Sequence, residues 1–161
     1  MIDYTKSRGW RNNNPLNIRR GSDTWMGQCC DQKDKQFVQF TAMRYGYRAA
    51  FRVLQSYYRL LTQQRKPFTL GRIIARWAPG TENNTRQYID FVAQRLTGMT
   101  GITVEFQPPT TPEGARHMGQ LMAAMTMMET GCPAEAVPYH DIAMGIFHAV
   151  GISVSNADIA I

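Results

Sequence analysis

The segment HMGQLMAAMTMMETG, residues 117–131, places a carboxylate where an amphipathic helix normally places another apolar side chain. Met118, Met122 and Met125 precede this acid, Glu129. The four residues lie at i, i+4, i+7 and i+11, which is the spacing of one face of a helix. The pattern predicts a packed helix whose apolar face ends in an acid. Burial raises the pKa of a carboxyl group, and a raised pKa suits a general acid near neutral pH. The alternative is that Glu129 faces solvent in the last helical turn.

Apolar residues recur at spacings of three and four in four further segments, and they predict helices over residues 43–63 and 70–78, within 81–98, and over 139–150. Start and stop signals define one more helix, the fourth along the chain, at residues 111–130, because Thr111 and Pro112 suit its beginning and Gly131 its end. Thr69 is the expected N-cap of the second helix, and Gly98 the expected stop of the third.

The region before the first predicted helix is rich in Asn, Gly and Arg, which indicates an ordered loop. Within it, the alternating run FVQF at residues 37–40 predicts a short strand, paired with the segment around residues 25–28. The expected fold is therefore mainly α, with about five helices and a small β-hairpin or loop lobe. A chain of 161 residues fits one domain spanning residues 1–161.

Composition narrows the classes of function. The chain has 43% hydrophobic and 19% charged residues and no run long and apolar enough to span a bilayer, so we expect a globular protein without a membrane span. Its N-terminal residues show neither a secretory signal nor a transit peptide. Cys29, Cys30 and Cys132 are an odd number and lack zinc-site spacing, so we expect no disulfide framework, no metal and no cofactor.

A net charge of +6 predicts attraction to an anionic partner. Nucleic acid, lipid headgroups and bacterial wall polymers all qualify. The arginines are spread along the chain without the dense block typical of a nucleic-acid-binding tail, so a solvated basic surface is favoured and a nucleic-acid partner is the weakest interpretation.

Two polar motifs hold further candidate residues. In WAPGTENNTRQY, residues 77–88, Asn and Trp side chains suit the amide and ring of an N-acetylated sugar, whereas helix capping by Thr81 or Thr85 is expected in any case. In RNNNPLNIRRG, residues 11–21, the asparagines offer donors and acceptors between Trp10 and Trp25, and they serve equally well as turn formers.

The order of these motifs carries a family resemblance. Residues 8–98, with RGWRNNNPLNIRRG, WMGQ, FVQFTAMRYGYRAAFRVLQSYYR and IIARWAPGTENNTRQYIDFVAQRLTG, closely resemble phage and prophage virion structural proteins that look related to peptidoglycan hydrolases. The succession is also similar to that of autolysin and flagellar-type N-acetylglucosaminidases of the lysozyme-like superfamily. In those enzymes a helix ending in a catalytic Glu comes first. Here no such leading helix precedes the asparagine motif, and the helix ending in METG resembles it. The resemblance therefore implies a circular permutation that moves the catalytic helix to the C-terminal side.

The resemblance implies a lysozyme-like domain that cleaves the glycan strands of peptidoglycan, as a glycoside hydrolase or a lytic transglycosylase. Glu129 would be the general acid and Glu82 the second acid. The groove would be lined by the asparagines and aromatic residues of the two motifs: Asn13, Asn14, Asn17, Trp25, Trp77, Asn83, Asn84 and Tyr88.

The main alternative is a noncatalytic phage or secretion-system structural module that binds the cell wall. We expect synthesis in the cytoplasm and action at the wall after delivery by a phage particle, a secretion system or lysis.

Overall fold

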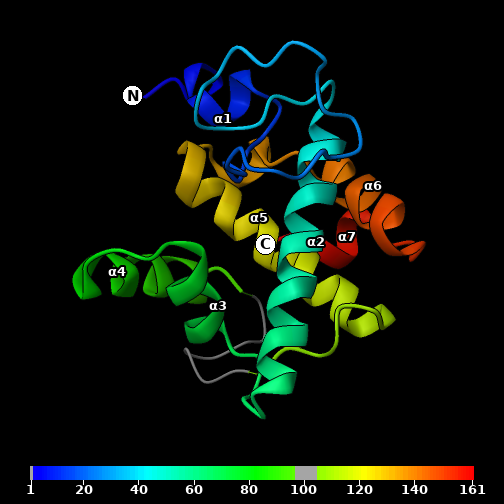
Figure 1. Ribbon diagram of the computed structural model, residues 1–161. Helices are drawn as coiled ribbons and strands as arrows, with labels where there is room; N and C mark the ends of the chain where they lie inside the picture. The colour runs from blue at the N-terminus through cyan, green and yellow to red at the C-terminus, as the bar shows by residue number, and fades with distance from the viewer. Residues whose placement is uncertain (1, 97–104) are drawn as a thin grey trace.

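The structure is a computed structural model that describes residues 2–96 and 105–161. It is mainly helical, as predicted, and two long helices form its body (Figure 1). Helix α2 spans Met43–Gln63, and helix α5 spans Pro112–Thr130 and passes behind α2 in the view of Figure 1. Helix α6, Tyr139–Val150, packs closely on α2. This approach requires Gly145, because a Cβ there would lie 2.8 Å from the Arg48 nitrogen.

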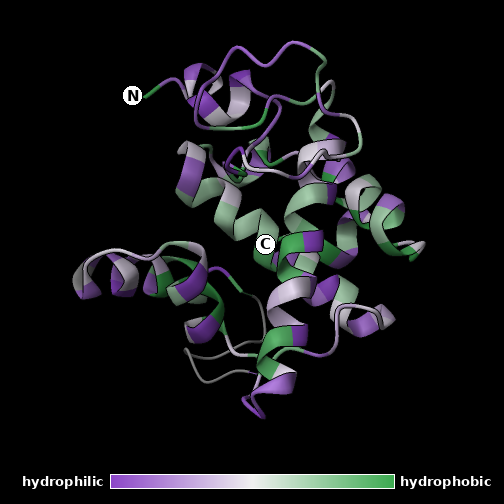
Figure 2. Ribbon diagram, in the orientation of Figure 1, coloured by the Kyte–Doolittle hydropathy of each residue, from purple (hydrophilic) through white to green (hydrophobic). Residues whose placement is uncertain are grey.

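The structure of α5 confirms the packed helix that the methionine spacing predicted. Met118, Met122 and Met125 are fully buried, and Figure 2 shows the helix as largely hydrophobic. The Thr111 hydroxyl accepts a hydrogen bond from the Gly114 nitrogen, and Gly131 ends the helix in the left-handed conformation with φ 77°. α5 therefore forms the core against which the other elements pack.

Helices α3, Leu70–Trp77, and α4, Glu82–Ala93, form an arm beside this body. Figure 1 shows α4 extending to the left, away from α2. Thr69 and Thr81 cap the two helices through their hydroxyl groups, which confirms Thr69 as a start signal. α4 ends at Ala93 rather than continuing to Gly98, and Gly98 lies outside the described residues. The arm contacts the body through α4 and α5.

Residues 12–42 form a loop lobe without a regular hairpin. Among the described residues, the expected pairing of residues 25–28 with 37–40 is reduced to one isolated bridge, Gln28 to Phe40, and a second bridge joins Arg19 to Phe37. Side chains replace the missing ladder: Asp34 accepts two hydrogen bonds from Arg8, at 2.6 and 2.7 Å. The expectation of a loop lobe is confirmed. The expected pairing is present but short: around the Gln28–Phe40 bridge the Cys29 nitrogen donates to the Gln39 carbonyl oxygen and the Thr41 nitrogen to the Gly27 carbonyl oxygen, and it does not extend into a regular ladder.

Several short elements complete the described chain. A 3₁₀ turn, η1, spans Tyr4–Lys6; helix α1 spans Arg8–Arg11; a second turn, η2, spans Ala134–Ala136; and helix α7 spans Asn156–Ile159. The described residues thus hold seven α-helices, two more than expected, because four-residue helices are too short to show a periodic pattern. Within the described part of the chain, no helix is long and apolar enough to cross a membrane.

Candidate active site

The asparagine loop of residues 12–17 brings a polar side chain to the end of α5. Asn13 and Asn17 adopt the left-handed backbone conformation, with φ 51° and 54°, which asparagine tolerates better than most residues. α2 lies directly against this loop at Gly46, where a Cβ would come within 2.4 Å of the Asn13 carbonyl oxygen. The loop is thereby fixed in a conformation that places Asn17 beside Glu129.

Three elements meet at the Glu129 carboxyl group. The Asn17 side-chain amide donates a hydrogen bond to Oε2 at 3.2 Å, and the Tyr88 hydroxyl donates to Oε1 at 3.1 Å. Asn17 comes from the loop lobe, Tyr88 from α4 and Glu129 from the last turn of α5. Both carboxyl oxygens are therefore held in fixed positions.

Burial raises the pKa of Glu129 above its ordinary value, because it removes water from the charged carboxylate. Hydrogen bonds from Asn17, Tyr88 and Trp77 act in the opposite direction, and their combined effect is smaller than that of burial. The negative end of α5 lies one residue away, and it disfavours the carboxylate further. Burial and the adjacent carboxylate also raise the pKa of Tyr88 well above 10, so its hydroxyl stays a donor.

A groove of about 410 Å³ opens beside these residues, between the loop lobe, α2 and the end of α3. Asn17, which hydrogen-bonds Glu129, and Trp77, whose indole group acts to lower the pKa of Glu129, line it. Trp77 packs edge-on against Tyr57, with ring centroids 6.2 Å apart. The remaining lining residues are Ile18, Arg19, Asp23, Trp25, Val53, Arg76 and Pro79. The groove thus combines aromatic faces with two cations and one carboxylate.

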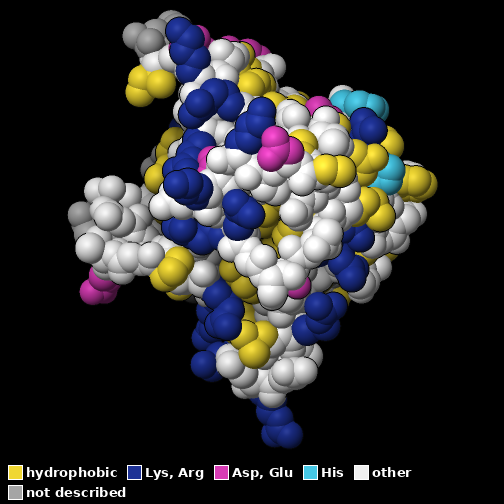
Figure 3. Space-filling view, turned by 45° about the horizontal axis from the view of Figure 1, so that its top comes forward, with side chains coloured by type: hydrophobic (Ala, Val, Ile, Leu, Met, Phe, Trp, Pro, Cys, Tyr) yellow, Lys and Arg dark blue, Asp and Glu magenta, His cyan; other side chains and the backbone are white. Residues whose placement is uncertain are grey.

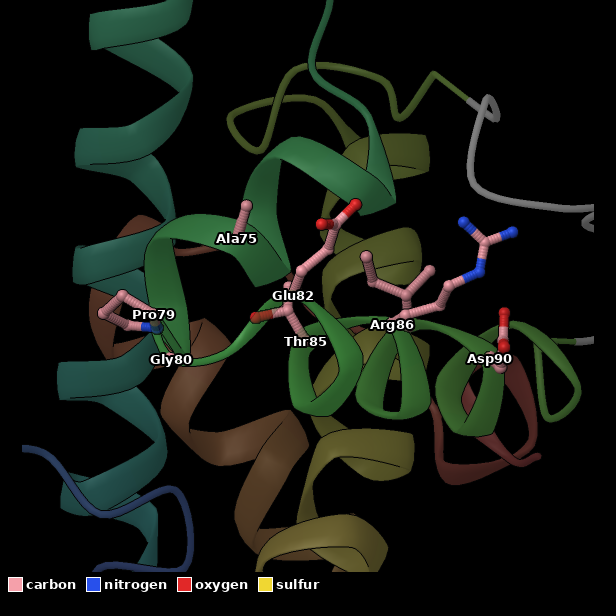
Figure 4. Close-up of a pocket in the computed structure, with 8 residues that line it drawn as sticks. Ala75, Pro79, Gly80, Glu82, Thr85, Arg86 and Asp90 are labelled. Atoms are coloured by element: carbon pink, nitrogen blue, oxygen red, sulfur yellow. The ribbon is translucent and has the colours of Figure 1, made fainter.

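A second groove, of about 350 Å³, lies between α3 and α4 (Figure 4). Glu82, Arg86 and Asp90 follow one another along the same side of α4, and Ala75 faces them from α3. Pro79 lines both grooves, so the two are adjacent at the turn between α3 and α4.

Comparison with known proteins gives the family of the chain. No family model matches it. Over 128 residues it is 38% identical to Protein P5 of Pseudoalteromonas phage PM2, and this match covers 78% of the chain and 72% of the phage protein. The chain belongs to the Protein P5 family. Its association with bacteriophages, expected from the resemblance, is supported by this relative.

In this member of the Protein P5 family, the structure brings together five of the residues predicted for the site. Glu129 contacts Asn17 and Tyr88, and Asn17, Trp25 and Trp77 line the first groove. These residues are separated by up to 112 positions in the sequence.

The position of Asn14 contradicts its predicted role in substrate binding. Asn14 is fully buried; its amide donates to the Ile18 and Val38 carbonyl oxygens, and its Oδ1 accepts from the Ile18 nitrogen. A substrate-binding role for Asn14 is wrong, because every side-chain hydrogen-bonding atom serves the loop. Asn13 also serves the loop, donating to the Phe40 carbonyl oxygen.

The acidic and amide residues at the start of α4 lie apart from the Glu129 groove. Glu82 is exposed in the first turn of α4 and lines the second groove, so it is not placed beside Glu129 as its expected partner acid. The Asn84 backbone nitrogen donates to Thr81 in the helix cap, and the Asn84 side chain is exposed. The side chain of Asn83 lies outside what the structure describes.

Sequence reasoning missed the groove residues with charged or further aromatic side chains, which are Arg19, Asp23, Tyr57 and Arg76. Asp23 lies two residues before Trp25, a predicted groove residue, and this proximity is the signal that could have identified it. Tyr57 and Arg76 lie within helical patterns that are typical of any packed helix, so nothing local distinguishes them. Arg76 lies over the Tyr57 ring, at 5.6 Å from its centroid.

The three cysteines are free thiols in the described part of the chain. Cys29, Cys30 and Cys132 form no disulfide there. Across residues 2–96 and 105–161, no group of three His, Cys, Asp or Glu side chains is arranged to hold a metal ion.

Proposed function

We propose that this protein cleaves the glycan strands of peptidoglycan, with Glu129 as the general acid. The observation that carries the proposal is the largely buried Glu129 carboxyl group, which has a raised pKa and is hydrogen-bonded by Asn17 beside an aromatic groove. A raised pKa favours the protonated carboxyl group, and a protonated carboxyl group can donate its proton to the oxygen of a glycosidic bond as that bond breaks.

The surroundings of Glu129 suit the neutral acid before a proton transfer and the carboxylate after it. Before the transfer, burial favours the neutral acid, which can donate its proton. After it, the Asn17 amide and the Tyr88 hydroxyl stabilise the carboxylate that remains, because both donate to its oxygens. The same two hydrogen bonds fix the direction in which the carboxyl group faces.

The first groove suits a chain of N-acetylated sugars. Trp25, Tyr57 and Trp77 offer flat apolar surfaces on which the apolar faces of sugar rings can stack, and Asn17 offers an amide beside them. Arg19 and Arg76 add positive charge at the groove. Figure 3 shows Lys and Arg side chains spread widely over the face of the molecule that it presents. Positive charge favours approach to anionic wall polymers.

Asp23 is the second carboxylate of the proposed mechanism, because it lines the first groove together with Asn17 and Trp77. Glu82 lines only the second groove. In a hydrolase, such a carboxylate activates water or attacks the sugar carbon. In a lytic transglycosylase, a hydroxyl group of the sugar itself attacks, and no second carboxylate is required. The chemical form of the new sugar end therefore distinguishes the two reactions.

The experiment compares the wild type with Glu129→Gln on purified cell-wall sacculi, with released fragments separated by liquid chromatography and identified by mass spectrometry. We expect the wild type to release glycan fragments and Glu129→Gln to be slower by about 10²–10⁴-fold, the usual contribution of a general acid. Glu113→Gln is the matched control, because Glu113 is an exposed acid in the first turn of the same helix. Full activity in Glu129→Gln would exclude this residue as the acid.

A second candidate function is a structural module of a phage particle that binds the cell wall or another virion protein. The relationship to a phage protein favours it. Action at the host wall, after delivery by a phage particle, is common to both proposals. If the wild type binds sacculi without releasing fragments, the structural module is the better account. Salt-sensitive DNA binding without wall binding would instead favour a nucleic-acid partner.

A further inference from the structure

We propose that the groove between α3 and α4 binds the stem peptide of peptidoglycan while the glycan strand occupies the first groove. The ligand is a short peptide that is attached to a sugar and carries a free amine and a free carboxylate. This inference rests on the proposed function, because it names the part of the same substrate that the second groove would hold. It assigns Glu82, Arg86 and Asp90 to substrate recognition rather than to bond cleavage.

The relative position of the two grooves supports one branched ligand. Pro79 lines both of them, so a branch that leaves a glycan in the first groove can enter the second at this residue. From there the second groove follows α4, past Glu82 and Arg86 to Asp90 (Figure 4). Glycan strands of peptidoglycan carry their peptides as side branches, so this layout matches their connectivity.

The length of the groove matches a peptide of about four residues. Glu82 and Asp90 are eight positions apart on one helix, which corresponds to about 12 Å along its axis. An extended chain spans about 3.3–3.6 Å per residue, so about four residues cover that distance. Pro79, Ala75 and Ile89 provide apolar surface along the groove, which suits small side chains such as alanine methyl groups.

The charges of the groove also fit a peptide with groups of both signs. Among the described residues, none lies within ion-pairing distance of the Glu82 and Asp90 carboxylates or of the Arg86 guanidinium. Arg86 can therefore bind a carboxylate in a forked geometry, and Glu82 or Asp90 can bind an amine. A polyanion such as nucleic acid would meet two carboxylates for one arginine, which disfavours it as the occupant.

The test measures kcat/KM on two substrates, namely glycan strands that carry stem peptides and the same strands after an amidase has removed the peptides. We expect the wild type to prefer the peptide-bearing strands. Arg86→Met should lower kcat/KM on those strands by about tenfold or more, the usual effect of one charge-assisted hydrogen bond, and leave the stripped strands unaffected. Arg59→Met is the control, since Arg59 is exposed on α2 and lines neither groove. Equal losses on both substrates, or no loss on either, would overturn the proposal.

A binding measurement separates failure of this inference from failure of the proposed function. A synthetic stem tetrapeptide is titrated into Glu129→Gln, with and without Arg86→Met, by isothermal titration calorimetry. Binding that weakens about fivefold or more with Arg86→Met supports the peptide site even if the wild type cleaves no glycan. Absence of peptide binding in Glu129→Gln overturns the site even if the wild type cleaves glycan strands efficiently. Thermal unfolding of each variant checks that the fold is intact.

Discussion

Replacing Tyr88 by Phe removes one of the hydrogen bonds that hold Glu129, with little other change. The Tyr88 side chain is 5% exposed, and its ring packs in the core beside α5, so Phe fills the same space. The lost hydroxyl donates to the Glu129 Oε1 atom at 3.1 Å. A hydrogen bond to a carboxylate stabilises the charged form, so its removal favours the protonated acid. We therefore expect Tyr88→Phe to raise the pKa of Glu129 further.

The size of this effect follows from the geometry. A hydrogen bond to a charged group contributes about 1.5–3 kcal/mol. A separation of 3.1 Å is long for a hydroxyl donor, so the lower value of about 1.5 kcal/mol applies. Since one pKa unit corresponds to about 1.4 kcal/mol, the pKa of Glu129 should rise by about one unit. The Asn17 and Trp77 donors remain and limit the increase.

The measurement is a carbon-13 NMR titration of glutamate carboxyl groups, in which the signal missing from Glu129→Gln identifies Glu129. It requires no activity, so it tests the electrostatics independently of the proposed function. Tyr58→Phe is the control, because the Tyr58 hydroxyl forms no side-chain hydrogen bond among the described residues and should leave the titration unchanged. A pKa of Glu129 that falls or stays constant in Tyr88→Phe would refute the reasoning.

Two further predictions concern stability. Asn14→Ala should lower the free energy of unfolding by about 2–4 kcal/mol, because it leaves buried backbone groups of Ile18 and Val38 without partners; a loss below about 1 kcal/mol in urea titration would contradict this role. Because the pKa of Glu129 is raised in the folded protein, the unfolded chain loses this proton at a lower pH than the folded protein does. The contribution of Glu129 to the free energy of unfolding therefore decreases as pH rises from about 4.5 through the folded-state pKa. Glu129→Gln should remove that decline, and the difference in melting temperature between variant and wild type should therefore grow from pH 4 to pH 7; a constant difference would count against it.

Helices were predictable where their signals are local. The range 43–63 matches α2 and 139–150 matches α6, and Thr111 and Gly131 define the ends around α5, because caps and apolar spacing act within a few residues. The run FVQF was predictable as an extended segment, but the extent of its pairing was not. The Val38 nitrogen donates to the Ile18 carbonyl oxygen and the Cys29 nitrogen donates to the Gln39 carbonyl oxygen, so the run is bonded to two segments through short bridges. Sequence alternation does not encode how far such pairing extends.

The site was only partly predictable, since it depends on contacts between distant segments. Glu129 stood out because its acid interrupts an apolar stripe, and this is a local signal. Its hydrogen bond with Asn17 joins residues 112 positions apart, which no spacing rule gives. The asparagines show the limit most clearly: Asn13 and Asn14 hold the loop, whereas Asn17 contacts the acid, and the three are chemically identical. Only the fold of the loop separates their roles.

The acidity of Glu129 depends on how the arm of α3 and α4 lies against α5. Burial is the largest cause of its raised pKa, and the arm contributes both Tyr88 and Trp77 to its surroundings. A movement of the arm away from α5 would admit water, favour the carboxylate and lower the pKa. A ligand that bound only to the closed arrangement would act in the opposite direction, since it would stabilise the dry, protonated state. The first groove is lined by the arm and also by the loop lobe and α2, so a glycan bound there would favour the closed arrangement and with it the form of the acid that donates its proton.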